Sequence, residues 1–174
     1  MIKTVTFGYR WEGLALHQWA FTHTDLLSIV VPANRTNLNI ENWAIWFRVP
    51  LIKQENEEAL NCIEQLKLLK PDIILCHCYT YKLAEGILEI PRLGCINIHP
   101  GKLPEYKGRK PIEDAMDKGD AELWGCLHYM DENFDTGKVI IQAPVKREDD
   151  LQGMRSSLTK AGLRLLEKEW GNIT

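Results

Sequence analysis

Short apolar runs alternate with amphipathic segments along most of the chain. The run at residues 26–31 is continuously apolar and ends at Pro32, as expected for a strand buried on both faces. The same pattern predicts further strands at residues 4–7, 48–52, 73–76, 95–99, 124–130 and 139–143. Between them, helices are predicted over residues 11–21, 59–69, 82–89, 112–118 and 151–165. Strands alternating with helices predict an α/β fold with a doubly wound, mainly parallel sheet.

One segment shows no clear period. Residues 33–47 are rich in Asn and Trp, and we interpret them as a long loop. A length of 174 residues fits a single domain spanning residues 1–174, and no repeat, linker or low-complexity segment divides it.

Composition narrows the function classes. The net charge of −3 gives no general attraction to nucleic acid or to an anionic membrane. The five cysteines are odd in number and unevenly spaced, so a disulfide framework is not expected. No apolar run approaches the length of a membrane span, and the N-terminus lacks a signal-peptide stretch. We therefore expect a cytoplasmic protein.

The most informative polar residues are Asn97, His99 and Asp135. Side chains alternate along a strand, so Asn97 and His99 share one face of the predicted strand 95–99, which Pro100 ends. Asp135 lies in a later loop next to Gly137. An amide, an imidazole and a carboxylate suit acyl transfer to an amine, because they stabilise an oxyanion, move a proton and orient the imidazole. A lone histidine at a strand end is, however, more often an ordinary polar group with a partner.

The surrounding residues are similar to a known family. Asn-x-His-Pro at residues 97–100 is followed by Leu-Pro-x-Tyr-x-Gly at 103–108, Pro-Ile at 111–112, Gly-Asp at 119–120 and Asp-x-Gly at 135–137. This succession resembles the core of the folate-dependent formyltransferases, which act on glycinamide ribonucleotide, methionyl-tRNA and amino sugars. The likeness covers residues 70–145. Gly101-Lys102 and Trp124 depart from the family pattern, which commonly has Ser-Leu and Gly there.

The resemblance implies a Rossmann-like formyltransferase fold, a one-carbon transfer reaction and 10-formyltetrahydrofolate as co-substrate, without a metal. It assigns catalysis to Asn97, His99 and Asp135. It also implies a pterin site between the segment 78–83 and the loop 131–135, with cofactor-binding residues Cys78, Tyr79, Thr80, Tyr81, Leu83, Asp131 and Phe134.

Several side chains are candidates for binding the second substrate. Arg10 follows the first strand, where many folds bind phosphate, and a basic loop with Lys102, Lys107 and Arg109 follows His99. For Arg10 a solvated surface residue is the better interpretation, whereas the basic loop fits a solvated loop and contact with a phosphate or the folate glutamate tail equally well. His128 precedes the Asp135 loop, at a position near the substrate in family members. His17 and His23 receive no role.

Cys76-His77-Cys78 offers a competing metal-site hypothesis. Alternation along an extended strand places His77 opposite the two cysteines, so the three do not converge on one ion. Buried structural cysteines are the better interpretation.

The acceptor does not follow from the motifs. The net acidic charge and the single small basic loop favour a small phosphorylated or nucleotide-linked amine over tRNA, and the chain ends soon after the last helix. We place an amino sugar nucleotide first and glycinamide ribonucleotide second, with a homodimer left open. The alternatives are a formyltetrahydrofolate hydrolase and a non-catalytic folate-binding protein of the same fold.

Overall fold

A computed structural model describes residues 1–35 and 37–174. Its seven strands follow the order β3-β2-β1-β4-β5-β6-β7, a mixed sheet accompanied by helices, as the alternating pattern predicted. The chain divides into two compact units, residues 1–96 and 97–174, and each is described by itself. The α/β fold class is confirmed.

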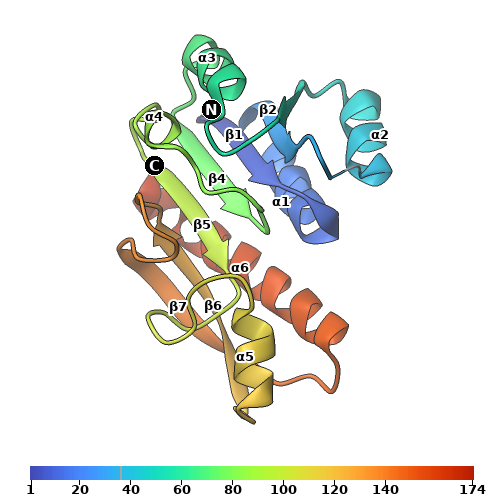
Figure 1. The fold of residues 1–174 in the computed structure, drawn as a ribbon, viewed down its shortest axis with the longest axis vertical. Helices are drawn as coiled ribbons and strands as arrows, with labels where there is room; N and C mark the ends of the chain where they lie inside the picture. Colours follow the sequence, from blue (N-terminus) through green and yellow to red (C-terminus); the bar gives the residue numbers. More distant parts are fainter. Residues whose placement is uncertain (36) are drawn as a thin grey trace. The chain divides into compact units, whose positions relative to one another are not determined.

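The first unit is a parallel α/β layer (Figure 1). Its strands are β1 (Lys3–Gly8), β2 (Asp25–Pro32), β3 (Leu51–Gln54) and β4 (Ile73–His77), and β5 (Cys95–His99) begins within it. Its helices are α1 (Arg10–His23), α2 (Leu38–Phe47), α3 (Leu60–Leu69) and α4 (Glu85–Leu88). Every residue of β4 is buried, which explains the apolar run at residues 73–76 that precedes His77.

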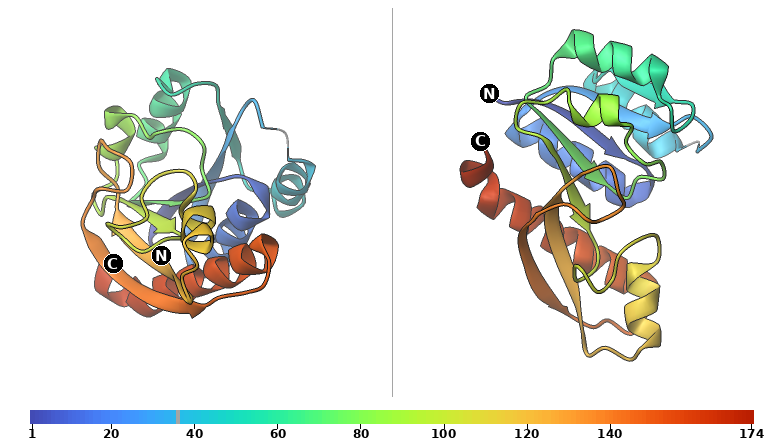
Figure 2. Two further views of the ribbon diagram at one scale, coloured as in Figure 1. Left: turned by 60° about the horizontal axis from the view of Figure 1, so that its bottom comes forward. Right: turned by 60° about the vertical axis from the view of Figure 1, so that its left-hand side comes forward.

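The order of the strands reverses between β1 and β4, which are parallel neighbours in the sheet. From β1 the chain runs outward through β2 to β3, then returns to pair β4 with the other side of β1. Right-handed crossovers then require α1 and α3 on opposite faces of these strands, as Figure 2 shows. Ligands of doubly wound sheets bind at such a switch point, outside the carboxyl ends of the strands. Here those ends are Gly8 and His77.

The predicted loop at residues 33–47 is wrong, because most of it forms α2. Asn37 caps this helix by accepting hydrogen bonds from the backbone N–H groups of Asn39 (3.2 Å) and Ile40 (3.3 Å). Ile40 and Ala44, one helical turn apart, are buried against β2. Thr36, also in the predicted loop, lies outside the described residues.

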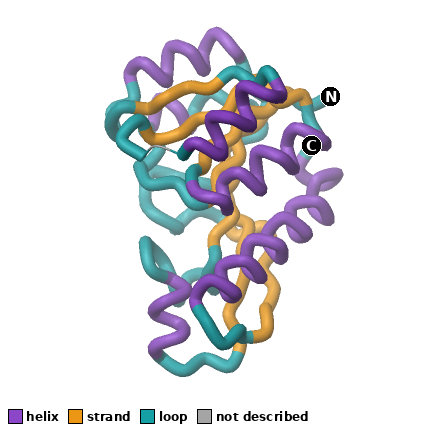
Figure 3. Tube along the Cα trace, turned by 90° about the vertical axis from the view of Figure 1, so that its right-hand side faces the viewer, coloured by secondary structure: helices purple, strands orange, loops and turns teal. Residues whose placement is uncertain are grey.

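The second unit is an antiparallel hairpin with two helices. It contains α5 (Pro111–Asp117), β6 (Glu122–Tyr129), β7 (Val139–Lys146) and α6 (Leu151–Ile173). Helix α6 contacts both strands (Figure 3) and starts at Asp150, whose carboxylate accepts the backbone N–H groups of Gln152 (2.8 Å) and Gly153 (2.9 Å).

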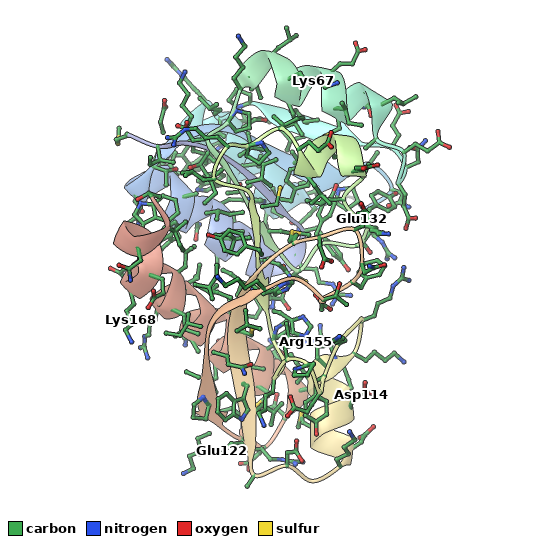
Figure 4. The ribbon with its side chains drawn as sticks, turned by 90° about the vertical axis from the view of Figure 1, so that its left-hand side faces the viewer. Lys67, Asp114, Glu122, Glu132, Arg155 and Lys168 are labelled. Atoms are coloured by element: carbon green, nitrogen blue, oxygen red, sulfur yellow. The ribbon has the colours of Figure 1, made fainter. Side chains whose placement is uncertain are left out.

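The two helices of this unit are joined by an apolar cluster and an ion pair. Met154 and Leu158 of α6 pack with Ile112 of α5. The Arg155 guanidinium, labelled in Figure 4, lies 2.8 Å from the Glu113 carboxylate. This packing supports β6 and so fixes the base of the loop between the two strands.

The remaining differences from the predicted elements lie at their ends. The strand expected at residues 48–52 occupies Leu51–Gln54, because Arg48 ends α2 in the left-handed conformation and Pro50 has no N–H to donate. The helix expected at 82–89 is confined to Glu85–Leu88, and the last one continues to Ile173. Among the described residues, none of the helices combines the length and apolar composition needed to cross a membrane.

Candidate functional site

Strand β5 presents Asn97 and His99 on one face, as the alternating pattern predicted. The opposite face carries Ile96 and Ile98, both buried. A Cβ on Gly162 of α6 would lie 2.2 Å from Ile98 Cγ2, so that glycine lets the helix approach the strand closely. The apolar contact fixes the orientation of β5, and with it the direction of the polar pair.

The loop between β6 and β7 carries Asp135. The position of this loop can be followed in Figure 4 from Glu132, a labelled residue of the same loop. The Asp131 carboxylate accepts the backbone N–H of Asn133 (3.0 Å) and the Thr136 hydroxyl (2.6 Å). A Cβ on Gly137 would lie 1.9 Å from the Tyr129 carbonyl oxygen, so only glycine allows the loop to close there. Asp135 itself has φ +54°, a conformation that Asp and Asn adopt more readily than most residues.

Asp135 brings the predicted triad together and adds His128. Its Oδ1 lies 3.4 Å from Nδ1 of His99, 3.4 Å from Nε2 of His128 and 3.4 Å from the Asn97 amide nitrogen. The same amide donates to His128 Nε2 at 3.1 Å, and the Gly108 N–H donates to Asp135 Oδ2 at 2.8 Å. The sequence had grouped His128 with the acceptor-binding residues; in the structure it contacts the triad directly.

Backbone carbonyls orient both imidazoles. His99 donates its Nε2–H to the Tyr106 carbonyl (2.6 Å). His128 donates its Nδ1–H to the carbonyl of the next residue, Tyr129 (2.8 Å). Each ring therefore turns its other nitrogen toward Asp135. Gly101 makes the first contact possible, because a Cβ there would lie 2.9 Å from both His99 Nε2 and the Tyr106 carbonyl oxygen. This gives a physical reason for the departure of residue 101 from the family pattern.

The electrostatics favour a neutral imidazole beside a charged carboxylate. Burial lowers the pKa of His99, against the opposing effects of Asp135 and of the Tyr106 carbonyl. Burial also acts to raise the pKa of Asp135, but the neighbouring His128 and His99 and the Gly108 N–H outweigh it and hold that pKa below its usual range. The resting site can therefore accept a proton, as general base chemistry requires.

The predicted pterin segment, residues 78–83, follows β4 at the switch point of the first unit. The Tyr79 hydroxyl donates to Gln54 (2.9 Å) and the Tyr81 hydroxyl to the Glu55 carbonyl (3.2 Å). Cys78 accepts a backbone hydrogen bond from Tyr9 (3.3 Å). Within the described part of the chain, the backbone groups of residues 80–83 make no hydrogen bonds to other backbone groups. These side chains are thus tied to neighbouring loops, while the backbone keeps donors and acceptors.

The other predicted binding residues differ in how far they are engaged. Asp131 and Phe134 are exposed in the second unit, beside Asp135 in sequence. Lys102 pairs with Glu105 (3.0 Å) and lies over the Trp124 ring (5.4 Å). Lys107 and Arg109 are exposed on the same loop, and Arg10, also exposed, lies over the Tyr9 ring in the first unit. Lys102 and Arg10 therefore each contact an aromatic ring, and Lys102 also forms an ion pair.

The face argument used for Cys76-His77-Cys78 is wrong in one respect. The strand ends at His77, and Cys78 has φ +51°, so the extended alternation does not continue through the third residue. Cys76 and His77 are buried and Cys78 is half-buried.

Two hydrogen-bond arrangements, those of the Tyr106 carbonyl and of His17, were not predicted from the sequence. The Tyr106 carbonyl that holds His99 carries no side-chain signal. His17, which had no predicted role, is buried between the Thr6 hydroxyl (2.7 Å) and the Gly8 carbonyl (3.3 Å). Its position about two turns into the helix that follows the first strand, and the alternating Thr-Val-Thr of that strand, were the available clues.

Comparison with known proteins gives a consistent result. Residues 33–168 match the family model described as formyl transferase. A methionyl-tRNA formyltransferase of Legionella pneumophila strain Corby is 36% identical over 129 residues, which is 73% of this chain and 41% of that protein. The chain thus spans about two fifths of the length of this curated relative.

Solved structures share the fold. The phosphoribosylglycinamide formyltransferase of Streptococcus pneumoniae superposes with a TM-score of 0.84 over 100% of both chains, at 24% identity. A likely sugar N-formyltransferase from Mycobacterium tuberculosis gives a TM-score of 0.77 at 16% identity, covering 99% of this chain and 68% of the other.

Proposed function

The chain belongs to the formyl transferase family, and from that premise we propose that it moves a formyl group from 10-formyltetrahydrofolate to the primary amine of a small molecule. The observation that carries the proposal is the convergence of Asn97, His99 and Asp135 at the end of β5. We further propose that residues 1–174 act as one catalytic domain and work in the cytoplasm.

In this mechanism the amine nitrogen forms a bond to the formyl carbon, whose carbonyl oxygen becomes an oxyanion. The Asn97 amide donates to that oxygen, and His99, held by the Tyr106 carbonyl, adds a positive charge beside it once Nδ1 takes up a proton. Asp135 stabilises the imidazolium. Collapse of the intermediate breaks the bond to N10 of the folate, which receives the proton that the amine loses. A placed proton-transfer group contributes roughly 100- to 10,000-fold, and one oxyanion donor about 3 kcal/mol.

The folate is assigned to the two segments that the resemblance indicated. Within this segment, the described backbone of residues 80–83 makes no hydrogen bonds to other backbone groups, which supports recognition of a pterin edge at the switch point of the first unit. Asp131 and Phe134 supply a carboxylate and an exposed ring on the loop that carries Asp135. The reaction so described uses no metal.

The acceptor is proposed to carry a phosphate or diphosphate group. Lys107 and Arg109 are exposed cations on the loop that also supplies Gly108 to Asp135, so they lie close to the reacting groups. Because the whole chain has a net charge of −3, a single basic loop suits one anionic group better than a long polyanion. As acceptor we rank an amino sugar nucleotide first and glycinamide ribonucleotide second. Because the chain is similar in sequence to methionyl-tRNA formyltransferases, methionyl-tRNA must be assayed beside them.

The test is a screen of amines with 10-formyltetrahydrofolate, following release of tetrahydrofolate and formation of the formamide. Calorimetry with a 5-deaza or reduced folate should show binding without added metal. Formamide formed from a phosphorylated amine supports the proposal. Tetrahydrofolate released equally fast without any amine identifies a hydrolase, and absence of folate binding rejects the proposal.

The acceptor site is tested with Lys107→Ala and Arg109→Ala. Each removes a cation that binds but does not react, so each should raise the KM for the amine more than it lowers kcat. Lys138→Ala, also exposed but on the far side of Gly137 in sequence, is the matched control. Formylation of methionyl-tRNA without activity on any phosphorylated small amine would overturn the acceptor assignment.

A further inference from the structure

His99, His128 and Asp135 form a cluster of buried hydrogen-bond acceptors. The two imidazole nitrogens that face Asp135 are those without a proton, because the other nitrogen of each ring donates to a backbone carbonyl. The carboxylate likewise only accepts. Three lone-pair groups thus meet around one volume, which favours a cation between them.

The spacing fits a tetrahedral metal. Ligand atoms 2.0–2.1 Å from a zinc ion at tetrahedral angles lie about 3.3–3.4 Å from one another. Asp135 Oδ1 lies 3.4 Å from each imidazole nitrogen, and all three ligand atoms lie within 4.8 Å of one another. The three ligand atoms therefore surround a single volume, and two of their three separations already have the tetrahedral value.

The second contacts of the two histidines resemble those of built metal sites. Metal-ligating histidines usually donate their other N–H to a carbonyl or carboxylate, which fixes tautomer and direction. His99 does so to Tyr106 and His128 to Tyr129. The Gly108 N–H donates to Oδ2 of the Asp135 carboxylate, so Oδ1 is the oxygen that faces the two rings. Tautomers and carboxylate are therefore preset for a cation.

We propose that His99, His128 and Asp135 bind a zinc-class divalent cation and that its binding excludes catalysis. The ion takes the His99 and Asp135 lone pairs that formyl transfer uses, so it acts as an inhibitor and not as a cofactor. Two imidazoles and one carboxylate select zinc, cobalt or nickel over magnesium and calcium, which prefer all-oxygen sites. The Asn97 amide, now donating to His128 and Asp135, would turn its oxygen toward the ion or leave a fourth position to water.

Binding itself does not depend on the proposed function; only the inhibition rests on it. The primary measurement is therefore calorimetric titration of the full chain with zinc sulfate in the absence of folate. We expect one zinc per chain at this site, and little heat from magnesium at the same concentration. Loss of a ligand's outer partner typically lowers metal affinity about 10- to 100-fold, so losing a ligand should cost at least about tenfold.

The variants are His128→Gln and Asp135→Asn. Asn accepts the positive φ of residue 135, so the second variant keeps the backbone even if the first fails to fold. His23→Gln removes an exposed histidine and controls for surface binding. Cys78→Ser tests the competing Cys76-His77-Cys78 site.

Zinc affinity that falls in His128→Gln and Asp135→Asn but not in His23→Gln or Cys78→Ser establishes the site. Affinity lost in Cys78→Ser and kept in Asp135→Asn, or absence of zinc binding, overturns it. If formyl transfer is found, zinc should abolish it and a chelator should restore it. A protein that binds zinc here but transfers no formyl group would disprove the proposed function alone.

Discussion

Two buried histidines, His99 and His17, sit in nearly the same kind of hydrogen-bond arrangement. Each turns its Nε2 toward a backbone carbonyl, His99 to Tyr106 at 2.6 Å and His17 to Gly8 at 3.3 Å. They differ at the other nitrogen. His17 Nδ1 meets the Thr6 hydroxyl at 2.7 Å, whereas His99 Nδ1 meets the Asp135 carboxylate at 3.4 Å.

That one difference separates a structural histidine from a reactive one. A hydroxyl can donate, so neutral His17 has both ring nitrogens satisfied and no use for another proton. Accordingly burial, opposed by the Gly8 carbonyl and assisted by His77, lowers the pKa of His17 to about 3. A carboxylate cannot donate, so the His99–Asp135 pair stays incomplete until a proton or a metal ion arrives. Burial of a histidine is thus a poor guide to its role, and the partner of its second nitrogen is a better one.

The largest effect should come from removing the reactive histidine or its partners. His99→Ala, Asn97→Ala and Asp135→Ala should each lower turnover at least about 100-fold, because proton transfer and oxyanion stabilisation are lost, while the protein stays folded. His17→Gln should keep most of its turnover. Tetrahydrofolate release measures both. Near wild-type turnover in His99→Ala, or an equal loss in His17→Gln, would erase the distinction.

A smaller effect is expected in the pH dependence of stability. The pKa of His17 is about 3 when folded and about 6.5 when unfolded, so the unfolded chain binds the proton first as pH falls. This group's stabilising contribution is present above pH 6.5 and is lost toward pH 3. At pH 5 it should amount to a loss of about 2 kcal/mol relative to pH 8.

Urea unfolding at several pH values measures this loss. His17→Gln should flatten the acid side of the profile by that amount. His23→Gln, at an exposed site, should retain the wild-type slope. Parallel profiles for wild type and His17→Gln would contradict the assignment of a permanently neutral ring.

The smallest effect tests the carbonyl that aims His99. In Gly101→Ala the new Cβ would lie 2.7 Å from Pro111 Cβ and 2.9 Å from His99 Nε2, so the ring must shift from Tyr106. Small displacements of a reacting group are costly, and turnover should fall about tenfold with the KM for folate little changed. Gly171→Ala, where a Cβ meets nothing within 4 Å, is the matched control and should be silent. Equal turnover in both variants would mean that this carbonyl does not position His99.

Alternation along the strand predicted the shared face of Asn97 and His99, and Asp135 was recognised as a loop carboxylate next to Gly137. The family motif assigned catalysis to all three, and the structure brings them together. His128 was assigned to the acceptor, because no local pattern shows that a strand irregularity beside Leu127 turns its ring toward Asp135. Helix α2 was missed although Ile40 and Ala44 have helical spacing, because the flanking Asn and Trp residues obscured the period. The Tyr106 carbonyl could not be predicted, since backbone groups are the same in every sequence.

The closed loop at Gly137 has a consequence for the order in which the site is assembled. Tyr129 donates its N–H to the Lys138 carbonyl (2.9 Å). His128 and Asp135 therefore come into contact as soon as the β6–β7 hairpin forms. Hairpins form in about 1–10 μs, far ahead of contacts between distant segments. Asn97 must reach His128 across 31 positions and Asp135 across 38, at a greater loss of chain entropy. The hairpin therefore brings His128 and Asp135 together early, whereas Asn97 and His99 join them only when β5 takes its place in the sheet.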